Sequence, residues 1–337
     1  MTRPTSWNDR GDHLMRKPSN FEAAYDALAR IESKSMTEEA IAEIKRALND
    51  KSSLLVARAA GIAGRRALRE LIPDMTAAFS RFMAAGAQAD KQCNAKSAIA
   101  DALNKLEYMG DSVFLAGAYY VQMEPVFGGH ADTAVDLRCN CAYGLARIGH
   151  PDAHYILADL LVDSERPVRA AAAKAISYLG CVEGELLLRL KVLTGDAEPD
   201  VISECFTSLM AMAPDRSLDF TARYLKSDDT SIAECAALAI GGSRIPQAFD
   251  TLKQCWEGDL SPVLHRMLLL PIALLRTDDA FDFLLEIVST ADIRTATQAL
   301  STLNLYADDE SVRRIREAVN TRGNTEIIER FHQEFPY

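Results

Sequence analysis

The sequence predicts an all-α protein: a right-handed α-solenoid of stacked antiparallel helix pairs. Three observations carry this prediction: an internal repeat of about 30–33 residues, a helical spacing of apolar residues within each repeat, and turn residues between the helices. Apolar anchor residues recur at intervals of 31, 33, 31, 31 and 30 residues. These anchors are Leu137, Val168, Val201, Ile232, Val263 and Ile293.

Each anchor is predicted to open the second helix of a pair. After Val168, for example, Ala171, Ala172, Ala175 and Ile176 fall on one buried stripe. A first helix is predicted before each anchor, and Gly, Pro and Asp residues separate the helices as stops and N-caps. The predicted first helices are Asp152–Asp163, Glu185–Thr194, Ser217–Lys226, Gln247–Glu257 and Ala280–Ser289. No stretch alternates apolar and polar residues as a half-buried strand would.

The N-terminal third is less regular but also helical. Helices are predicted over Phe21–Ser33, Thr37–Asn49, Leu54–Leu68, Glu70–Ala85 and Ala95–Leu106. We expect a flexible arm at 1–18, irregular helical repeats at 19–134, and regular repeats at 135–337 that continue the same solenoid. The segment 124–132 reads as a longer connector, and insertions in repeat arrays often carry function.

Composition narrows the class of protein. The chain has 337 residues, 48% hydrophobic, with a net charge of -11, which excludes a disordered chain and argues against a nucleic-acid coat. No apolar run approaches the length of a membrane span, and the N-terminus lacks a signal-like apolar core, so we expect a cytoplasmic protein without membrane insertion. Seven scattered cysteines without a CxxC pair indicate core-filling thiols.

Residues 137–180 resemble the HEAT-like repeats named from phycobilisome lyases. The two copies read LRCNCAYGLARIGHPDAHYILADLLVD and RPVRAAAAKAISYLG, and looser copies extend over roughly 135–320. His150 stands where the family usually has Asp, and the later copies lose the arginine after the anchor, with Ile202 and Ala233 in its place. The resemblance implies the architecture and says little about function.

Enzymes built on similar repeats are not matched by this sequence. There is no His-Glu pair of the kind that binds iron in deoxyhypusine hydroxylase, and the acidic pI of about 5.1 disfavours a DNA glycosylase of the HEAT-like type. His150 and His154 have a ligand-like spacing, but Pro151 sets His150 at or before the helix start and no third ligand is evident. We therefore predict no catalytic residue, no metal and no cofactor.

Resemblance to HEAT solenoids implies a concave, partner-facing surface on the second helices. The helical register places six side chains on that surface for a protein or peptide partner. They are Tyr143, Arg147, Lys174, Tyr178, Phe206 and Met210. Ordinary solvated surface is the alternative for these residues.

Arg138 and Arg169 are predicted to point outward too, but a structural role competes. Asp132 precedes Arg138 by six residues, and Asp163 precedes Arg169 by six. This repeated spacing resembles the Asp–Arg ladder that ties neighbouring HEAT units together. The two arginines are therefore either ladder residues or binding residues.

Negative charge is concentrated late in the chain. Residues 195–310 hold 20 acidic and 8 basic side chains. Many of these acids stand at predicted helix starts, where they cap amides; the alternative is an acidic surface that steers a basic partner. The sequence predicts a non-catalytic protein-binding scaffold or adaptor. The alternatives are an immunity or inhibitor protein that caps a basic toxin and an accessory subunit of a bilin lyase; the oligomeric state is left open.

Overall fold

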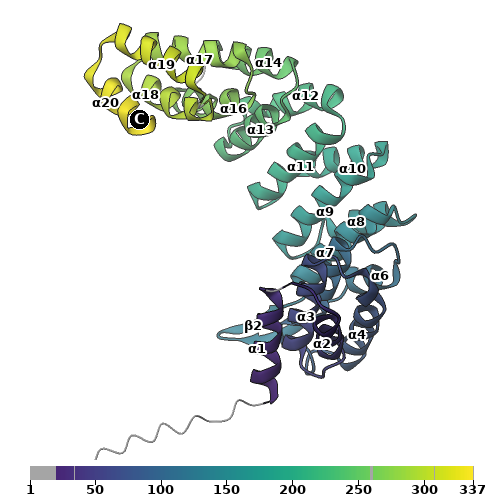
Figure 1. Cartoon of the computed structure of the whole chain (residues 1–337). Helices are drawn as coiled ribbons and strands as arrows, with labels where there is room; N and C mark the ends of the chain where they lie inside the picture. The colour runs from purple at the N-terminus through teal and green to yellow at the C-terminus, as the bar shows by residue number, and fades with distance from the viewer. Residues whose placement is uncertain (1–19, 34, 259–260, 307, 337) are drawn as a thin grey trace, which may run out of the picture. The chain divides into compact units, whose positions relative to one another are not determined.

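A computed structural model describes residues 20–33, 35–258, 261–306 and 308–336. The predicted flexible arm at 1–18 lies outside these residues. The described chain is helical apart from one hairpin, which confirms the predicted all-α class and its stacked helices (Figure 1). Its contacts form two compact units, one made of residues up to 109 together with 121–137, the other of 110–120 together with 138–337.

The first unit packs irregular helices and carries the hairpin. Thr37 caps its second helix by accepting a hydrogen bond from the amide of Ala40 at 3.2 Å. The elements are α1 (Asn20–Glu32), α2 (Glu38–Leu48), α3 (Ser53–Arg65), η1 (Arg69–Leu71), α4 (Ile72–Ala85), η2 (Lys91–Cys93), α5 (Asn94–Lys105), β1 (Met123–Val126) and β2 (Gly129–Asp132).

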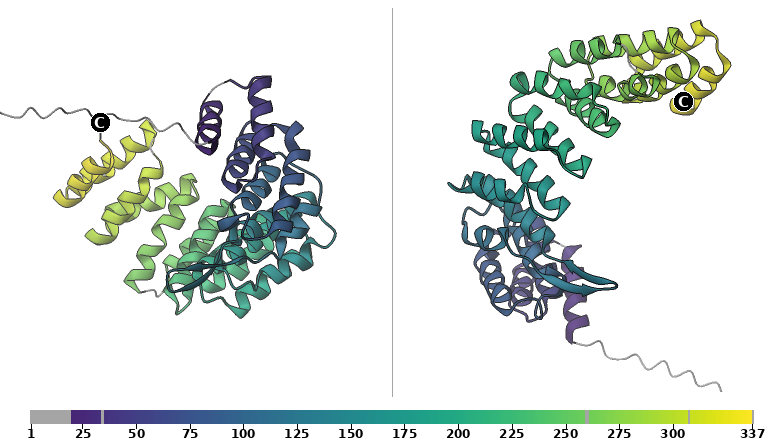
Figure 2. Two further views of the ribbon diagram at one scale, coloured as in Figure 1. Left: turned by 90° about the horizontal axis from the view of Figure 1, so that it is seen from below. Right: turned by 180° about the vertical axis from the view of Figure 1, so that it is seen from behind.

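The hairpin corrects the expectation that no strand would form. β1 and β2 pair antiparallel with Val126 opposite Gly129, and Gly128 takes the positive φ of 88° that the tight turn needs (Figure 2). Most of its side chains are exposed, so the segment lacks the alternating pattern that marks a half-buried strand. Beside its base, Lys96 and Asp90 form a fully buried ion pair at 3.1 Å.

The second unit is a stack of helix pairs. Figure 1 shows the first helices α8, α10 and α12 following one another along one flank, and the second helices α9, α11 and α13 along the other. The elements are α6 (Ser112–Ala118), α7 (Val135–Ile148, which starts in the first unit), α8 (Ala153–Leu160), α9 (Arg166–Leu179), α10 (Val182–Thr194), α11 (Pro199–Met212), α12 (Pro214–Ala222), η3 (Arg223–Lys226), α13 (Thr230–Ser243), α14 (Gln247–Trp256), α15 (Pro262–Met267), α16 (Leu269–Leu274), α17 (Asp278–Thr290), α18 (Ile293–Thr302), η4 (Leu303–Leu305), α19 (Asp309–Arg322) and α20 (Thr325–Glu334).

The core of the second unit follows the predicted stripe. In α9 the anchor Val168 and the residues Ala171, Ala172, Ala175 and Ile176 are all buried, as predicted. Small residues allow close approach between helices elsewhere. A Cβ at Gly144 of α7 would lie 2.4 Å from the ring of Phe114 in α6, and a Cβ at Gly241 of α13 would lie 2.2 Å from the carbonyl oxygen of Pro271.

Candidate interaction surfaces

Four of the six predicted binding residues occupy two accessible positions of the second helices. Tyr143 and Lys174 stand six residues after their anchors, and Arg147 and Tyr178 stand ten residues after them. Lys174 and Tyr178 are exposed, while Tyr143 and Arg147 are half-buried. We call these four side chains the second-helix face. They come from the neighbouring helices α7 and α9, and the equivalent residues of α11 are the smaller Thr207 and Ala211.

The prediction that Phe206 and Met210 are exposed is wrong. Phe206 is 0% exposed, and its ring packs against the ring of Tyr224 in a tilted arrangement with the centroids 5.1 Å apart. Met210 is 3% exposed. Phe206 stands five residues after its anchor, and Ala142, Ala173 and Ala237 are buried at the equivalent position. A second helix in the stack packs against its own first helix and against neighbouring second helices, so its buried face is wider than one stripe.

Tyr143 of the second-helix face is half-buried and lies within reach of a carboxylate. Burial raises the pKa of Tyr143 to about 12, and the nearby charges of Glu204 in α11 and Tyr178 in α9 add to the shift. Tyr143 is therefore neutral at physiological pH. The guanidinium carbon of Arg147 lies 5.9 Å from the centroid of the Phe114 ring. This contact holds the Arg147 side chain against α6.

Arg138 is a ladder residue. It is 1% exposed, and its Nε and Nη2 donate to the two carboxylate oxygens of Asp163 at 2.9 and 3.1 Å. Its Nη1 donates to the carbonyl of Tyr120 at 2.9 Å. Asp163 in turn accepts a hydrogen bond from the amide of Glu165 at 2.8 Å, before α9 starts. The guanidinium thus joins α7 to the loop between α8 and α9.

Arg169 repeats the arrangement one helix pair later. Its Nε and Nη2 donate to Asp196 at 2.8 Å each, and its Nη1 donates to the Asp163 carbonyl at 2.9 Å. Lys191 also approaches Asp196 at 2.8 Å. Burial alone would raise the pKa of Asp196, but the hydrogen bonds from Arg169 and Lys191 outweigh it and hold the pKa well below its usual range.

The ladder differs from the sequence expectation in its partners. Each arginine binds the carboxylate of the loop after the next first helix, not the carboxylate of the aspartate six residues before it; Arg169 contacts that earlier aspartate, Asp163, only at its backbone carbonyl. Asp132, which precedes Arg138 by six, accepts instead from the amides of Gln122 and Ala134 at 3.0 and 2.9 Å. At the next repeats Ile202 and Ala233 replace the arginine and are buried.

A second surface lies on the first helices and was not predicted. Four side chains of α10 form a solvent-facing apolar row with spacings of 4, 4 and 3 residues. We call this row the α10 stripe: Val182, Leu186, Leu190 and Leu193, each more than half exposed. Tyr155 and Val162 of the α8 segment are equally exposed, and they occupy the positions equivalent to Leu186 and Leu193.

The same positions are polar in later repeats. The buried residues Leu188 of α10 and Thr221 of α12 align the two helices 33 residues apart. In this alignment charged residues replace the whole α10 stripe: Asp215, Asp219, Arg223 and Lys226, all exposed. In α14 the counterparts of Asp219 and Arg223 are Asp250 and Gln254.

Many late acidic residues serve the helices themselves. Asp229 caps α13 through the amide of Ser231 at 2.9 Å, and Asp308 caps α19 through the amide of Ser311 at 2.9 Å. The hydrogen bonds from the Ser311 side chain and amide lower the pKa of Asp308. Thr277, rather than the following aspartates, caps α17. Helix capping therefore explains part of the negative charge late in the chain, as expected.

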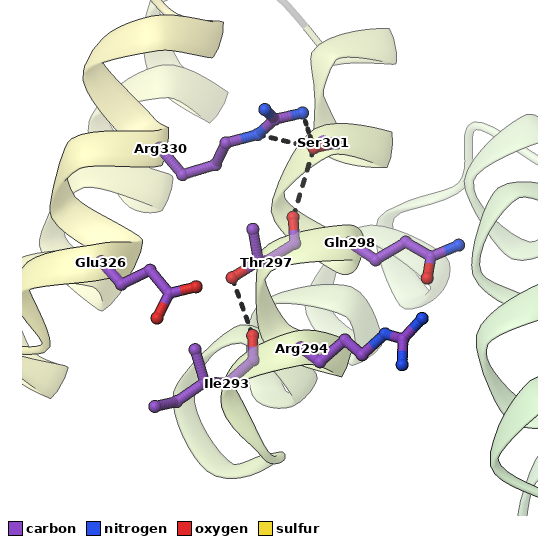
Figure 3. A pocket seen from close by; sticks show the side chains of 7 residues that line it. All are labelled: Ile293, Arg294, Thr297, Gln298, Ser301, Glu326 and Arg330. Carbon is purple, nitrogen blue, oxygen red and sulfur yellow. Dashed lines mark hydrogen bonds between the residues drawn. The ribbon is translucent and has the colours of Figure 1, made fainter.

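A groove of about 680 Å³ lies between α18 and α20 and is lined by Arg294, Gln298, Glu326 and Arg330 among others (Figure 3). Arg330 Nε donates to Ser301 Oγ at 3.2 Å, and Arg330 also pairs with Glu334. The bond to Ser301 joins α20 to α18, whereas the pair with Glu334 lies within α20.

Thiols and potential metal-ligand groups are scattered along the part of the chain that the structure describes. No cluster of three or more His, Cys, Asp and Glu side chains there could hold a metal ion. The seven cysteines are free, and burial raises the pKa of Cys93 to about 11 and of Cys205 to about 12. His150 Nδ1 accepts from the amide of Asp152 at 3.1 Å. Among the described helices, none combines the length and the apolar character that crossing a bilayer requires.

The family model described as PBS lyase HEAT-like repeat matches residues 137–163, which cover most of α7 and all of α8. The fold and this match define the class: an α-solenoid that contains a HEAT-like repeat of the PBS lyase type. No curated protein matches the chain.

Solved structures that resemble this chain are distant in sequence. The complex of CpcE and CpcF of phycocyanin lyase from Nostoc sp. PCC7120 is 16% identical with a TM-score of 0.35, over 86% of this chain and 97% of that chain. An engineered protein is 16% identical with a TM-score of 0.38, over 93% of each chain. A second engineered protein is 12% identical with a TM-score of 0.17, over 89% of this chain and 96% of that chain.

Proposed function

We propose that the protein is a non-catalytic scaffold or adaptor that binds a protein or peptide segment on its second-helix face. The observation that carries this proposal is the grouping of Tyr143, Arg147, Lys174 and Tyr178 at equivalent accessible positions of α7 and α9. Tyrosine and arginine are the residue types that contribute most to protein interfaces. Tyr178, 63% exposed, is the outermost of the large side chains.

Rigidity beneath this face supports the same function. The ladder arginines Arg138 and Arg169 hold α7 and α9 to the loops that follow α8 and α10 through paired hydrogen bonds. A surface that is already ordered loses little conformational entropy when a partner binds. The ladder thus contributes to affinity by fixing the helices that carry the tyrosines, without touching the partner.

The electrostatics of the face favour a partner segment that carries both an apolar or aromatic group and an acidic group. Lys174 supplies an exposed cation, and the two tyrosines supply aromatic contact area and hydroxyl groups. The charge of Glu204 on α11 acts on Tyr143 and disfavours an acidic group near that tyrosine. The acidic group of the partner would therefore lie at Lys174.

Co-purification from the native cell tests the function. The full-length protein carries a tag, and captured proteins are quantified by mass spectrometry for the wild type, for Lys174→Glu combined with Tyr178→Ala, and for the control Lys51→Glu. We expect the same stoichiometric partner with the wild type and the control, and at least a tenfold loss with the double variant. Equal capture by all three proteins would refute the assignment of this face.

One observation favours a second candidate, an accessory subunit acting with a lyase on a protein-bound bilin. That observation is the match of residues 137–163 to the PBS lyase HEAT-like repeat. Visible absorbance of the captured partner distinguishes the candidates. A partner that carries a covalent bilin favours the accessory subunit, and a colourless stoichiometric partner favours the general scaffold.

A further inference from the structure

The first-helix surface of α8, α10, α12 and η3 carries an inference that is separate from the second-helix face. Its centre is the α10 stripe, flanked by Tyr155 and Val162 on one side and by the charged residues of α12 and η3 on the other. We propose that two copies of this chain associate through this surface, with α10 of one copy antiparallel to α10 of the other.

The apolar area is large enough for such a contact. Six side chains, each more than half exposed, present on the order of 700 Å² of apolar surface, whereas monomeric proteins usually leave patches of a few hundred Å². A stable interface buries about 800 Å² per partner. The patch and its charged rim together approach that area. Charged residues occupy the equivalent positions of α12 and η3, so exposure of leucines at these positions is not a property of the repeat itself.

The charge pattern beside the stripe is self-complementary. Asp215 and Asp219 lie toward the N-terminal end of α12, and Arg223 and Lys226 follow in η3. All four are exposed, and none forms an ion pair within the residues that the structure describes. The acidic end of one copy therefore matches the basic end of another copy that runs in the opposite direction.

An antiparallel arrangement satisfies the apolar and charged rows together. A two-fold axis across the middle of α10 sets Leu186 opposite Leu190 of the second copy and places α12 over its own counterpart. Asp219 then faces Arg223 of the second copy, and Asp215 faces Lys226. If the axis ran along the helices instead, the charged row of α12 would lie on the apolar row of α8. The pattern thus selects a second copy in one orientation as the occupant.

The mass of the full-length protein in solution is the first test. Light scattering or sedimentation is measured from about 1 to 100 µM protein, because an interface of this size gives dissociation constants from micromolar downward. We expect a dimer for the wild type, and a monomer for Leu186→Asp combined with Leu190→Asp, with dimerisation weakened at least about 100-fold. Both side chains are solvent-exposed in the single chain, so circular dichroism and the Tm should stay unchanged.

Charge exchange tests the orientation. Asp219→Arg and Arg223→Asp each place like charges opposite one another in the antiparallel dimer, and each should weaken association about tenfold at low salt. The double variant Asp219→Arg with Arg223→Asp restores opposite charges and should recover most of the loss. The matched control Gln254→Glu, at the equivalent position of α14, should leave the dimer unchanged.

Three results would overturn the proposal: a wild type that stays monomeric at 100 µM, a dimer that survives Leu186→Asp with Leu190→Asp, or a double charge exchange that is no better than the single variants. A monomer whose stripe is occupied by a different captured protein would overturn it as well. None of these results bears on the second-helix face, because that face does not include the varied residues.

Discussion

Helix pairs α7–α10 and α11–α14 have the same fold but differ on both of their faces. The first set carries the ladder arginines Arg138 and Arg169, large polar and aromatic side chains on its second helices, and apolar side chains on its first helices. The second set has Ile202 and Ala233 at the ladder positions and charged residues on α12. A repeat fold keeps its packing positions and varies its exposed ones, so we propose that binding is concentrated at the exceptional exposed residues.

The largest expected effect comes from breaking the ladder. Arg169→Ala leaves the Asp196 carboxylate with only Lys191 and the Glu198 amide as partners, and it should lower the free energy of unfolding by about 3 kcal/mol. Arg166→Ala, which removes the exposed ion pair with Asp200, should cost less than about 1 kcal/mol. Urea denaturation measures both. Equal losses of unfolding free energy for the two variants would show that the ladder stabilises the α7–α10 repeats no more than an exposed ion pair does.

Close helix contacts at one glycine in each set come next. Gly144→Ala and Gly241→Ala push a Cβ into Phe114 and into the Pro271 carbonyl, and each should cost about 2 kcal/mol. Gly242→Ala is the control, since its Cβ meets open space in the same helix as Gly241, and it should be neutral or stabilising by up to about 1 kcal/mol. Thermal unfolding measures the shifts. A neutral Gly241→Ala would contradict the close approach of α13 and α16.

A smaller effect depends on pH. The folded state lowers the pKa of Asp196, so its contribution to stability is complete above the unfolded value of about 4 and is lost as pH falls below it. Asp196→Asn should therefore reduce the loss of unfolding free energy between pH 6 and 3 by on the order of 1 kcal/mol. Urea titrations at several pH values measure this slope. An unchanged slope would mean that Asp196 is not held ionised by Arg169.

The smallest effect on stability is expected at the second-helix face. Lys174→Glu with Tyr178→Ala alters side chains that the structure leaves exposed, so the free energy of unfolding should change by less than about 0.5 kcal/mol. The same urea titration gives the value. A loss of several kcal/mol would assign these residues to packing and remove them from the proposed binding surface.

The sequence predicted the helix starts at the repeat anchors, the buried stripe of α9 and the position of most helices, because these depend on local periodicity. Two of the apolar anchors are nevertheless exposed, Val263 at 58% and Ile293 at 39%. The sequence did not show that Phe206 is buried while Tyr143 is partly accessible. The width of a buried face depends on neighbouring helices, which the periodicity of one helix does not include. The ladder partners were misassigned for the same reason: Asp163 and Asp196 reach the arginines only through the stacking of repeats.

The apolar residues of the α10 stripe are visible in the sequence, but their exposure to solvent is not. α10 carries leucines and valines on both its buried and its exposed side: Leu188 and Val192 are buried, whereas Leu186 and Leu190 are exposed. A helix that is apolar all round normally indicates burial on all sides. Alignment of the repeats through their buried residues would have shown that the positions of the stripe are solvent-facing, because charged residues fill them in α12.

One measurement tests the central claim that the α7–α10 repeats carry two independent binding surfaces. Light scattering gives the mass of the co-purified complex for three proteins: the wild type, Leu186→Asp with Leu190→Asp, and Lys174→Glu with Tyr178→Ala. We predict two copies with partner for the wild type, one copy with partner for the first variant, and two copies without partner for the second. Variants that each lose both the partner and the second copy would contradict the account.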